Sequence, residues 1–275
     1  MTDSDLDSPF QQALSAWLLK HQGEPAGVQI LDIAGRRIVI KRRRDTLKTR
    51  LIYCLRYLRS STLAWLCLLT LGELPSARVL LRNGLDDEAQ RLVQLRVAGC
   101  RVPLILRHAP GVLVLEYVGQ DMPYLLRTAL QENRLDLVAK VARDLAVFHQ
   151  AGFVHGGAQL RNVMSENGVL TRIDFEENIG EALSHPVGQA YDVYQMISSM
   201  AGLRGHEFSP HDRQALCDRL MSAYLQANPD PLVARELSRM ARPLGLLHQS
   251  LGWLLKRLPG RDVQGFVHVA NTFRL

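Results

Sequence analysis

Residues 148–178 constrain the fold of this chain most, because short apolar segments there end in polar side chains. An apolar-periodic segment over about 135–150 predicts a helix, and Gly152 suits the end of that helix. A short strand at 153–154 is then predicted to lead into a polar loop that carries Asn162.

The second half of this stretch is predicted to be a further strand. A turn at 167–168 precedes apolar residues 169–173, which lead directly to Asp174. An amide at Asn162 and a carboxylate at Asp174 would then lie at the ends of neighbouring strands. Asp and Asn oxygens, with water and phosphate, are the ligands that Mg²⁺ prefers. An ordinary β-hairpin with polar ends has the same spacing, so both interpretations remain open at this point.

The pattern resembles the catalytic and metal-binding loops of the protein-kinase-like superfamily. Within it the chain is most similar to an atypical bacterial branch: lipopolysaccharide (Kdo and heptose) kinases, RIO-type kinases and aminoglycoside-phosphotransferase-like enzymes. Those families read roughly H-x-x-G-x-x-H-G-D-x-x-x-x-N, followed by I-D-F. The matching residues are His149, Gly152, His155, Gly156, Asn162 and Ile173-Asp174-Phe175. The resemblance spans about residues 28–200, and Gly157 stands where the families carry the catalytic Asp.

The resemblance implies an α+β, two-lobed protein-kinase-like fold, with a small β-rich N-lobe and a larger helical C-lobe. The N-lobe is expected over 1–118, with an αC-like helix over 85–98 and a basic and apolar insertion over 42–75. The C-lobe, with the catalytic and metal loops, is expected over 119–275. Periodicity further predicts helices over 9–20, 121–131, 210–226, 231–243 and 244–258, a helix that opens at 190–196, a hairpin over 28–33 and 37–41, and a strand over 111–118.

Lys41 ends the apolar run 38–40, which resembles the kinase strand whose Lys holds the ATP phosphates. Lys41 also opens a run of basic residues, so a plain surface charge is the alternative. Glu88 is expected to pair with Lys41. Alternatively, Glu88 would interact with the dipole at the N-terminus of the helix. Asp86 and Asp87 already make that interaction.

The resemblance also implies roles for residues outside the Lys41 pair. Glu116 to Val118 would present backbone groups to adenine. His155 would support the backbone of the metal loop, and Asp192 would anchor the catalytic loop through its backbone N–H groups. An ordinary acid at a helix start is the alternative for Asp192.

Gly157 cannot accept the proton of a substrate hydroxyl, and loss of a general base costs roughly 10²–10⁴-fold in rate. Three functions remain open. The first is an ATP- and Mg²⁺-dependent phosphotransferase, in which Glu176 or Glu177 compensates, acting on lipopolysaccharide or a lipid-linked sugar at the inner membrane. The second is a nucleotide-binding pseudokinase that regulates or scaffolds a protein partner. The third is a non-enzymatic RNA- or membrane-binding protein. Glu176 and Glu177 are alternatively a solvated acidic turn, or Glu176 adds a metal contact.

The chain has a net charge of +6, and its excess of basic residues is concentrated in one stretch. Residues 36–59 hold ten Lys or Arg and one Asp, a net +9, so the rest of the chain carries −3. A local basic patch predicts an anionic partner, such as an anionic membrane surface or a lipid-linked sugar. The insertion lies either at a membrane interface or in a buried helical hairpin with a solvated basic face. It lacks the interleaved aromatics of a single-strand binder, which disfavours nucleic acid.

Composition agrees with a globular protein, since 47% of the residues are hydrophobic and 22% are charged. The four cysteines show no C-x-x-C spacing, and the first residues are acidic and polar. No apolar run approaches the roughly 18 residues of a spanning helix. We therefore expect a cytoplasmic protein, with peripheral attachment to the inner membrane as a further expectation.

Overall fold

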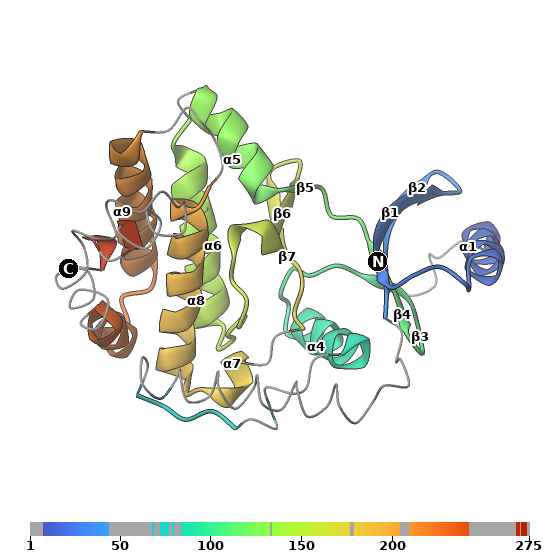
Figure 1. Cartoon of the computed structure of the whole chain (residues 1–275), viewed down its shortest axis with the longest axis horizontal. Coiled ribbons are helices and arrows are strands. Elements are labelled where there is room, and N and C mark those ends of the chain that lie inside the picture. Colours follow the sequence, from blue (N-terminus) through green and yellow to red (C-terminus); the bar gives the residue numbers. More distant parts are fainter. Residues whose placement is uncertain are drawn as a thin grey trace.

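The computed structural model describes residues 8–43, 84–132, 134–176, 179–203 and 209–241, with short pieces at 68, 72–76, 79, 268–269 and 271–273. Its described residues form two parts, an N-terminal antiparallel sheet with two helices and a helical C-terminal part (Figure 1). The predicted two-lobed α+β fold is therefore confirmed. Most of the predicted insertion at 42–75 lies outside the described residues, so the structure does not test whether it meets a membrane.

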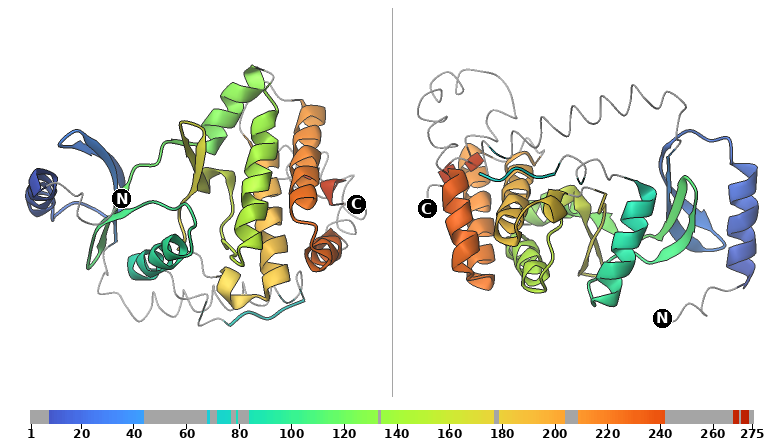
Figure 2. Two further views of the ribbon diagram at one scale, coloured as in Figure 1. Left: turned by 180° about the vertical axis from the view of Figure 1, so that it is seen from behind. Right: turned by 90° about the horizontal axis from the view of Figure 1, so that it is seen from below.

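The N-terminal sheet has four antiparallel strands in the order β1-β2-β4-β3. These strands are β1 (Gly27–Ile33), β2 (Arg36–Arg42), β3 (Ile105–Ala109) and β4 (Val112–Glu116). Helix α1 (Ser8–Lys20) covers one face and helix α4 (Leu85–Val97) lies on the other, between the sheet and the helical part (Figure 2). The turn between β1 and β2 is tight, because Ala34 and Gly35 both have positive φ, at 50° and 73°.

Successive side chains along β2 point to opposite faces of the sheet. Ile38 and Ile40 are buried with Phe10 and Leu14 of α1, whereas Val39 packs against the apolar cluster of α4. By the same alternation Lys41 shares the α4 face with Val39, and Arg42 shares the α1 face with Ile40. The adjacent basic residues Lys41 and Arg42 therefore lie on opposite faces of the sheet.

The helical part surrounds one large buried apolar cluster. Its elements are α5 (Met122–Gln131), α6 (Asp136–Gln150), α7 (Ile179–Ala182), α8 (His185–Ala201) and α9 (Pro210–Ala227). A small sheet of β5 (Gln120–Asp121), β6 (Val163–Glu166) and β7 (Val169–Arg172), with a 3-10 turn at Leu160–Asn162, lies between this bundle and the N-terminal part. A further helical stretch covers 231–241.

Several element predictions are confirmed to within a few residues. These are the leading helix, the hairpin over 28–41, the helix from 85, the strand near 111–118, and the helices near 121–131, 135–150 and 210–226. The helix predicted to open at 190–196 instead begins at His185, and β3 was not predicted. The helix predicted over 244–258 lies outside the described residues. No helix among the described residues is long and apolar enough to cross a membrane.

The strand predicted at 153–154 is wrong, since these residues pair with no strand. The physical reason lies in where the backbone groups bond. The carbonyl of Val154 accepts from Arg91, and the next two amides donate to the Asp192 carboxylate. Side chains therefore replace the ladder that a strand would need.

Gly119 joins β4 to β5 and offers a stability test. Its φ is +100°, and a Cβ there would lie 2.1 Å from the carbonyl oxygen of Ser165. Gly152 has φ +85° with nothing within 4 Å, so it is a matched control. We expect Gly152→Ala to lower the free energy of unfolding by about 1–2 kcal/mol from backbone strain alone. Gly119→Ala should cost clearly more, because its clash is with backbone. Urea denaturation measures both, and equal losses would contradict the packing at Gly119.

Candidate functional site

Lys41 joins three segments that are far apart in the sequence. Its Nζ lies 2.7 Å from Oε1 of Glu88 and 2.8 Å from Oδ1 of Asp174. Lys41 comes from β2, Glu88 from the first turn of α4, and Asp174 from the loop after β7. The pair that the sequence predicted between Lys41 and Glu88 is therefore present, and Asp174 is a second carboxylate partner of the same ammonium.

Burial sets the electrostatics of this group. Desolvation by itself would lower the pKa of Lys41, but the charges of Glu88 and Asp174 outweigh it and raise that pKa. Lys41 therefore stays an ammonium. Glu88 is fully buried, and its burial raises the pKa of the carboxyl group against the lowering effect of Lys41. Its second oxygen, Oε2, has no hydrogen-bond partner within the described part of the chain.

Three carboxylates converge where a cation would be held. Oxygens of Glu88, Asp174 and Glu176 lie within 4.8 Å of one another. Hard oxygen ligands at this spacing suit Mg²⁺, and Oε2 of Glu88 has no hydrogen-bond partner among the described residues that would compete with a cation. Glu176 also pairs with Arg43, at 2.7 Å between Oε2 and Nη2. The residues present therefore fit a divalent cation.

The backbone of Asn162 lies close to these three carboxylates. Its carbonyl accepts from the N–H of Ile173 at 3.0 Å, which places it next to the residue before Asp174. Its side-chain Nδ2 donates to the carbonyl of Gly157 at 2.8 Å. That bond uses the amide nitrogen of Asn162. The amide oxygen, which is the atom that can bind a cation, takes no part in it.

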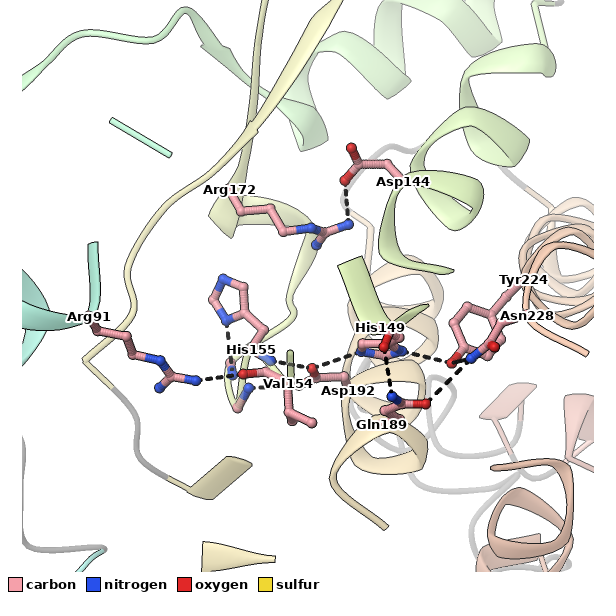
Figure 3. Close-up of polar contacts among 12 residues, drawn as sticks. Arg91, Asp144, His149, Val154, His155, Arg172, Gln189, Asp192, Tyr224 and Asn228 are labelled. Atoms are coloured by element: carbon pink, nitrogen blue, oxygen red, sulfur yellow. Dashed lines mark hydrogen bonds and ion pairs between the residues drawn. The ribbon is translucent and has the colours of Figure 1, made fainter. Parts of the chain in front are cut away.

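Asp192 of α8 holds the loop that the sequence singled out (Figure 3). Its Oδ2 accepts from the N–H of His155 at 2.6 Å, and its Oδ1 accepts from the N–H of Gly156 at 2.8 Å. Burial would raise the pKa of Asp192, but hydrogen bonds from His149 and from the backbone of His155 lower it. A charged, fully buried carboxylate therefore satisfies two loop amides, which is the geometry that the resemblance implied.

His149 connects that carboxylate to α9. Its Nε2 lies 3.1 Å from Oδ2 of Asp192, and its Nδ1 lies 2.7 Å from the hydroxyl of Tyr224 (Figure 3). Burial lowers the pKa of His149, so the ring is neutral, with Nε2 as the donor and Nδ1 as the acceptor. Asn228 donates to the same hydroxyl at 2.9 Å. Sequence reasoning did not assign Tyr224 or Asn228, because no local pattern reports a partner 75 residues from His149.

His155 contacts the backbone of Gly157 and the backbone just before Asp174. Its Nε2 lies 3.1 Å from the carbonyl of Ile173, and its Nδ1 accepts from the N–H of Gly157 at 3.2 Å. The ring stacks on Phe175, with 4.3 Å between centroids. Burial lowers the pKa of His155 to about 4, so a neutral ring fills a structural position here.

Two arginines that were not predicted from the sequence make buried contacts close to the loops that carry His155 and Asp174. Arg91 of α4 donates to the carbonyl of Val154 at 2.5 Å, with its guanidinium 5.6 Å from the centre of the Phe175 ring. Arg172 of β7 pairs with Asp144 of α6 at 2.5 Å (Figure 3). Both are buried, a rare state for arginine. Their sequence signal was only a basic residue on an apolar helix or strand.

Gly157 occupies the position of the expected catalytic Asp. Its N–H is bonded to His155, and its carbonyl accepts from Asn162 and from the N–H of Gln159 at 2.7 Å. Its φ is not in the left-handed region, so φ by itself would not strain an L-residue at this position. The residue proposed to compensate, Glu176, pairs with Arg43, and Glu177 lies outside the described residues.

The expected adenine-binding segment follows β4. The N–H of Glu116 donates to the carbonyl of Leu104 at 2.9 Å, and the Glu116 carboxylate accepts from the N–H of Leu104 at 3.2 Å. Those two groups of Glu116 are therefore already used. Val118 is buried just before Gly119, at the joint between the two parts.

Comparisons with known proteins agree with this geometry. A family model described as RIO domain matches residues 73–191. The "Probable bifunctional tRNA threonylcarbamoyladenosine biosynthesis protein" of Haloquadratum walsbyi (strain DSM 16790 / HBSQ001) is 34% identical over 117 residues, which are 42% of this chain and 20% of that protein. The "KEOPS complex subunit Bud32" of Pyrococcus abyssi (strain GE5 / Orsay) is 31% identical over 91 residues, which are 32% of this chain and 41% of that protein.

The chain thus spans a fifth of the first relative and about two fifths of the second. Among solved structures, a Map kinase from Leishmania major aligns over 94% of this chain and 81% of its own, with a TM-score of 0.34 and 15% identity. The RIO-domain match covers less than half of the chain and agrees with the predicted protein-kinase-like superfamily. The two relatives give no support to the predicted lipopolysaccharide-kinase branch, because neither is named as such a kinase.

Stability should depend on pH through His155. Its pKa is about 4 in the folded chain and near 6.5 when unfolded, so between these values only the unfolded chain takes up the proton. The free energy of unfolding is therefore complete above pH 6.5 and falls as the pH drops towards 4, by roughly 3 kcal/mol in total. Urea denaturation across this range should show a shallower slope for His155→Gln. His211→Gln, at an exposed position of α9, should keep the slope of the parent. Identical slopes in all three proteins would contradict this account.

Proposed function

We propose that this chain is an atypical kinase of the RIO and Bud32 type that binds ATP with Mg²⁺ between its two parts. One observation carries the proposal: the ammonium of Lys41 bridges Glu88 of the N-terminal part and Asp174 of the loop after β7, at 2.7 and 2.8 Å. An ammonium held in this way can take the α/β-phosphates of ATP when it leaves Asp174 for them. The match to the RIO domain supports the same function.

Each residue of the site has a proposed task. Glu88 fixes the position of the Lys41 ammonium, because this carboxylate is buried and bonded to it. Asp174, Asn162 and Glu176 would hold Mg²⁺, which when bound neutralises charge on the phosphates. Val118 and the backbone around it would meet adenine. Asp192 and His155 act on position only, since both bond to loop backbone.

Phosphoryl transfer requires the proton of the acceptor hydroxyl to leave, and position 157 has no side chain to take it. Kinase chemistry depends mainly on positioning and charge neutralisation, so loss of that base slows transfer without abolishing it. Gly157 is also the specific observation that favours a second candidate, a nucleotide-binding pseudokinase that regulates or scaffolds a partner. Glu176 is the proposed substitute base only if it leaves Arg43 and does not hold Mg²⁺.

The acceptor and partner follow less directly. One relative is named as a subunit of the KEOPS complex, and we extend this to propose that the present chain works in a protein assembly. We also propose a cytoplasmic location, and a boundary between lobes at 118–119, where β4 gives way to β5. Neither the relatives nor the described residues support the lipopolysaccharide acceptor or the membrane partner predicted from the sequence.

Calorimetry with Mg-ATP tests the proposed binding. Lys41→Met removes a charge-assisted contact to phosphate, worth about 1.5–3 kcal/mol, so affinity should fall by roughly 10- to 150-fold. Asp174→Asn should also weaken binding, specifically when Mg²⁺ is present. Lys20→Met, at the exposed end of α1, is the matched control and should bind as the parent does. Full affinity in both site variants would remove the basis of the proposal, provided that circular dichroism shows both to be folded.

A second experiment separates the two candidate functions. Gly157→Asp places a carboxylate at the position of the expected base, where φ suits an L-residue. If the site is a kinase that lacks only this group, turnover of ATP should rise by roughly 10²–10⁴-fold over the parent. Gly157→Asn has the same size without the base and should stay at the parent rate. Should the Asp and Asn variants turn over ATP equally slowly, the pseudokinase interpretation stands instead.

A further inference from the structure

A chain of buried hydrogen bonds leads from the end of α9 to the loop that carries His155 (Figure 3). Nδ2 of Asn228 donates to the hydroxyl of Tyr224 at 2.9 Å, and this hydroxyl lies 2.7 Å from Nδ1 of His149. On the other side of the ring, Nε2 lies 3.1 Å from Oδ2 of Asp192. All four side chains are buried, and Tyr224 and Asp192 are fully excluded from solvent. Because a buried polar group is costly unless it is paired, such a network fixes one arrangement of its members.

The direction of donation along this chain follows from the chemistry of its groups. The amide nitrogen of Asn228 can only donate, so the oxygen of Tyr224 is its acceptor. The single proton of the Tyr224 hydroxyl is then left for Nδ1 of His149, which must accept it. The proton of the neutral ring is therefore on Nε2, and it is donated to Asp192. Every step points towards the carboxylate.

A second branch from the same amide holds the backbone of His149. Nδ2 of Asn228 also lies 3.4 Å from Oε1 of Gln189, and Nε2 of Gln189 donates to the carbonyl of His149 at 3.1 Å. His149 is thus held by its ring and by its carbonyl. Both contacts lead back to Asn228, which is the C-cap residue of α9.

The Tyr224 hydroxyl favours the neutral ring, because it uses the lone pair of Nδ1 that a second proton would take. Burial lowers the pKa of His149 most. Asp192 raises that pKa, and the charges of Arg172 and His185 lower it. Without the hydroxyl, Nδ1 would be a buried acceptor that has lost its donor. The ring would then take up a second proton more readily, directly beside Asp192.

The contacts continue beyond Asp192 to a residue that is proposed to hold Mg²⁺. Asp192 accepts the N–H groups of His155 and Gly156 at 2.6 and 2.8 Å, which sets the backbone up to Gly157. The carbonyl of Gly157 in turn accepts from Nδ2 of Asn162 at 2.8 Å. The position of this carbonyl therefore determines how the amide of Asn162 is turned, and with it the direction of the amide oxygen.

We propose that Tyr224 is a positioning residue for the candidate site: its hydroxyl keeps the ring proton of His149 on Nε2 and thereby fixes the loop that orients Asn162. The inference rests on the proposed function, because it gives Tyr224 a part in holding Mg²⁺. Tyr224 touches neither nucleotide nor cation in this account. It acts only through His149 and the loop.

Nuclear magnetic resonance tests the first half of the proposal on the full chain, with an isotope label in the histidine nitrogens alone. The label reports the ring of His149, the amide of His155 in the loop and the amide of His149 within α6. In Tyr224→Phe we expect the ring to become an imidazolium at weakly acidic pH, where the parent ring stays neutral. Exchange of the His155 amide with solvent should also speed up by roughly 2- to 12-fold relative to the His149 amide, which is the effect of losing about one hydrogen bond. A role in packing alone would speed both amides by the same factor.

Two further variants complete this test. Tyr194→Phe, on α8, is the matched control, because its ring lies against Phe273 and its hydroxyl is outside the network. It should leave the ring of His149 and the amide of His155 unchanged. Asn228→Ala removes the group that directs the Tyr224 proton but keeps the hydroxyl, so the same changes should appear at smaller size. It keeps the test valid if Tyr224→Phe does not fold.

Calorimetry tests the second half. Affinity for Mg-ATP should fall by roughly 2- to 12-fold in Tyr224→Phe, and ATP without Mg²⁺ should bind as it does to the parent. The inference is overturned if the folded variant binds Mg-ATP as tightly as the parent, or if the ring of His149 and the relative exchange of the His155 amide do not change. If the parent itself does not bind Mg-ATP, the proposed function fails, and the histidine signals alone then decide whether Tyr224 fixes the loop.

Discussion

The contact on which the rest of the structure depends is the ammonium of Lys41 between two carboxylates. It is the point where the sheet, α4 and the loop after β7 meet. Burial makes Glu88 and Lys41 costly alone, since Glu88 is fully excluded from solvent and only 12% of the Lys41 side chain is exposed. The three-residue group therefore forms only when all three segments are in place.

A second buried charge gives the loop beside it a fixed shape. Asp192 accepts two backbone N–H groups and a histidine ring, so the loop from His155 to Gly157 needs no strand partner. Phe175 and His155 then stack, which links the carboxylate network to the residues around Asp174. The absence of a side chain at Gly157 leaves this scaffold intact.

Much of the site was open to prediction from sequence, because its residues follow recognisable local elements. Lys41 ends an apolar strand, Glu88 lies in the first turn of a helix, and Asp174 follows an apolar strand. The strand predicted at 153–154 failed, because two apolar residues do not reveal that side chains will take the backbone bonds nearby. The carboxylate group with Glu88 as a candidate cation ligand was also not foreseen, since the sequence had assigned Glu88 to Lys41 alone.

The sequence by itself determined the periodicity of the helices and strands, and with it which residues stand at their ends. Those features depend on neighbours a few positions away, which a sequence displays. Only the tertiary structure decided which ends meet. The bonds of His149 with Tyr224 and Asp192 join segments with no shared local pattern. Their formation depends on how helices and sheet pack, because burial and the pairing of buried charges are set by the whole fold.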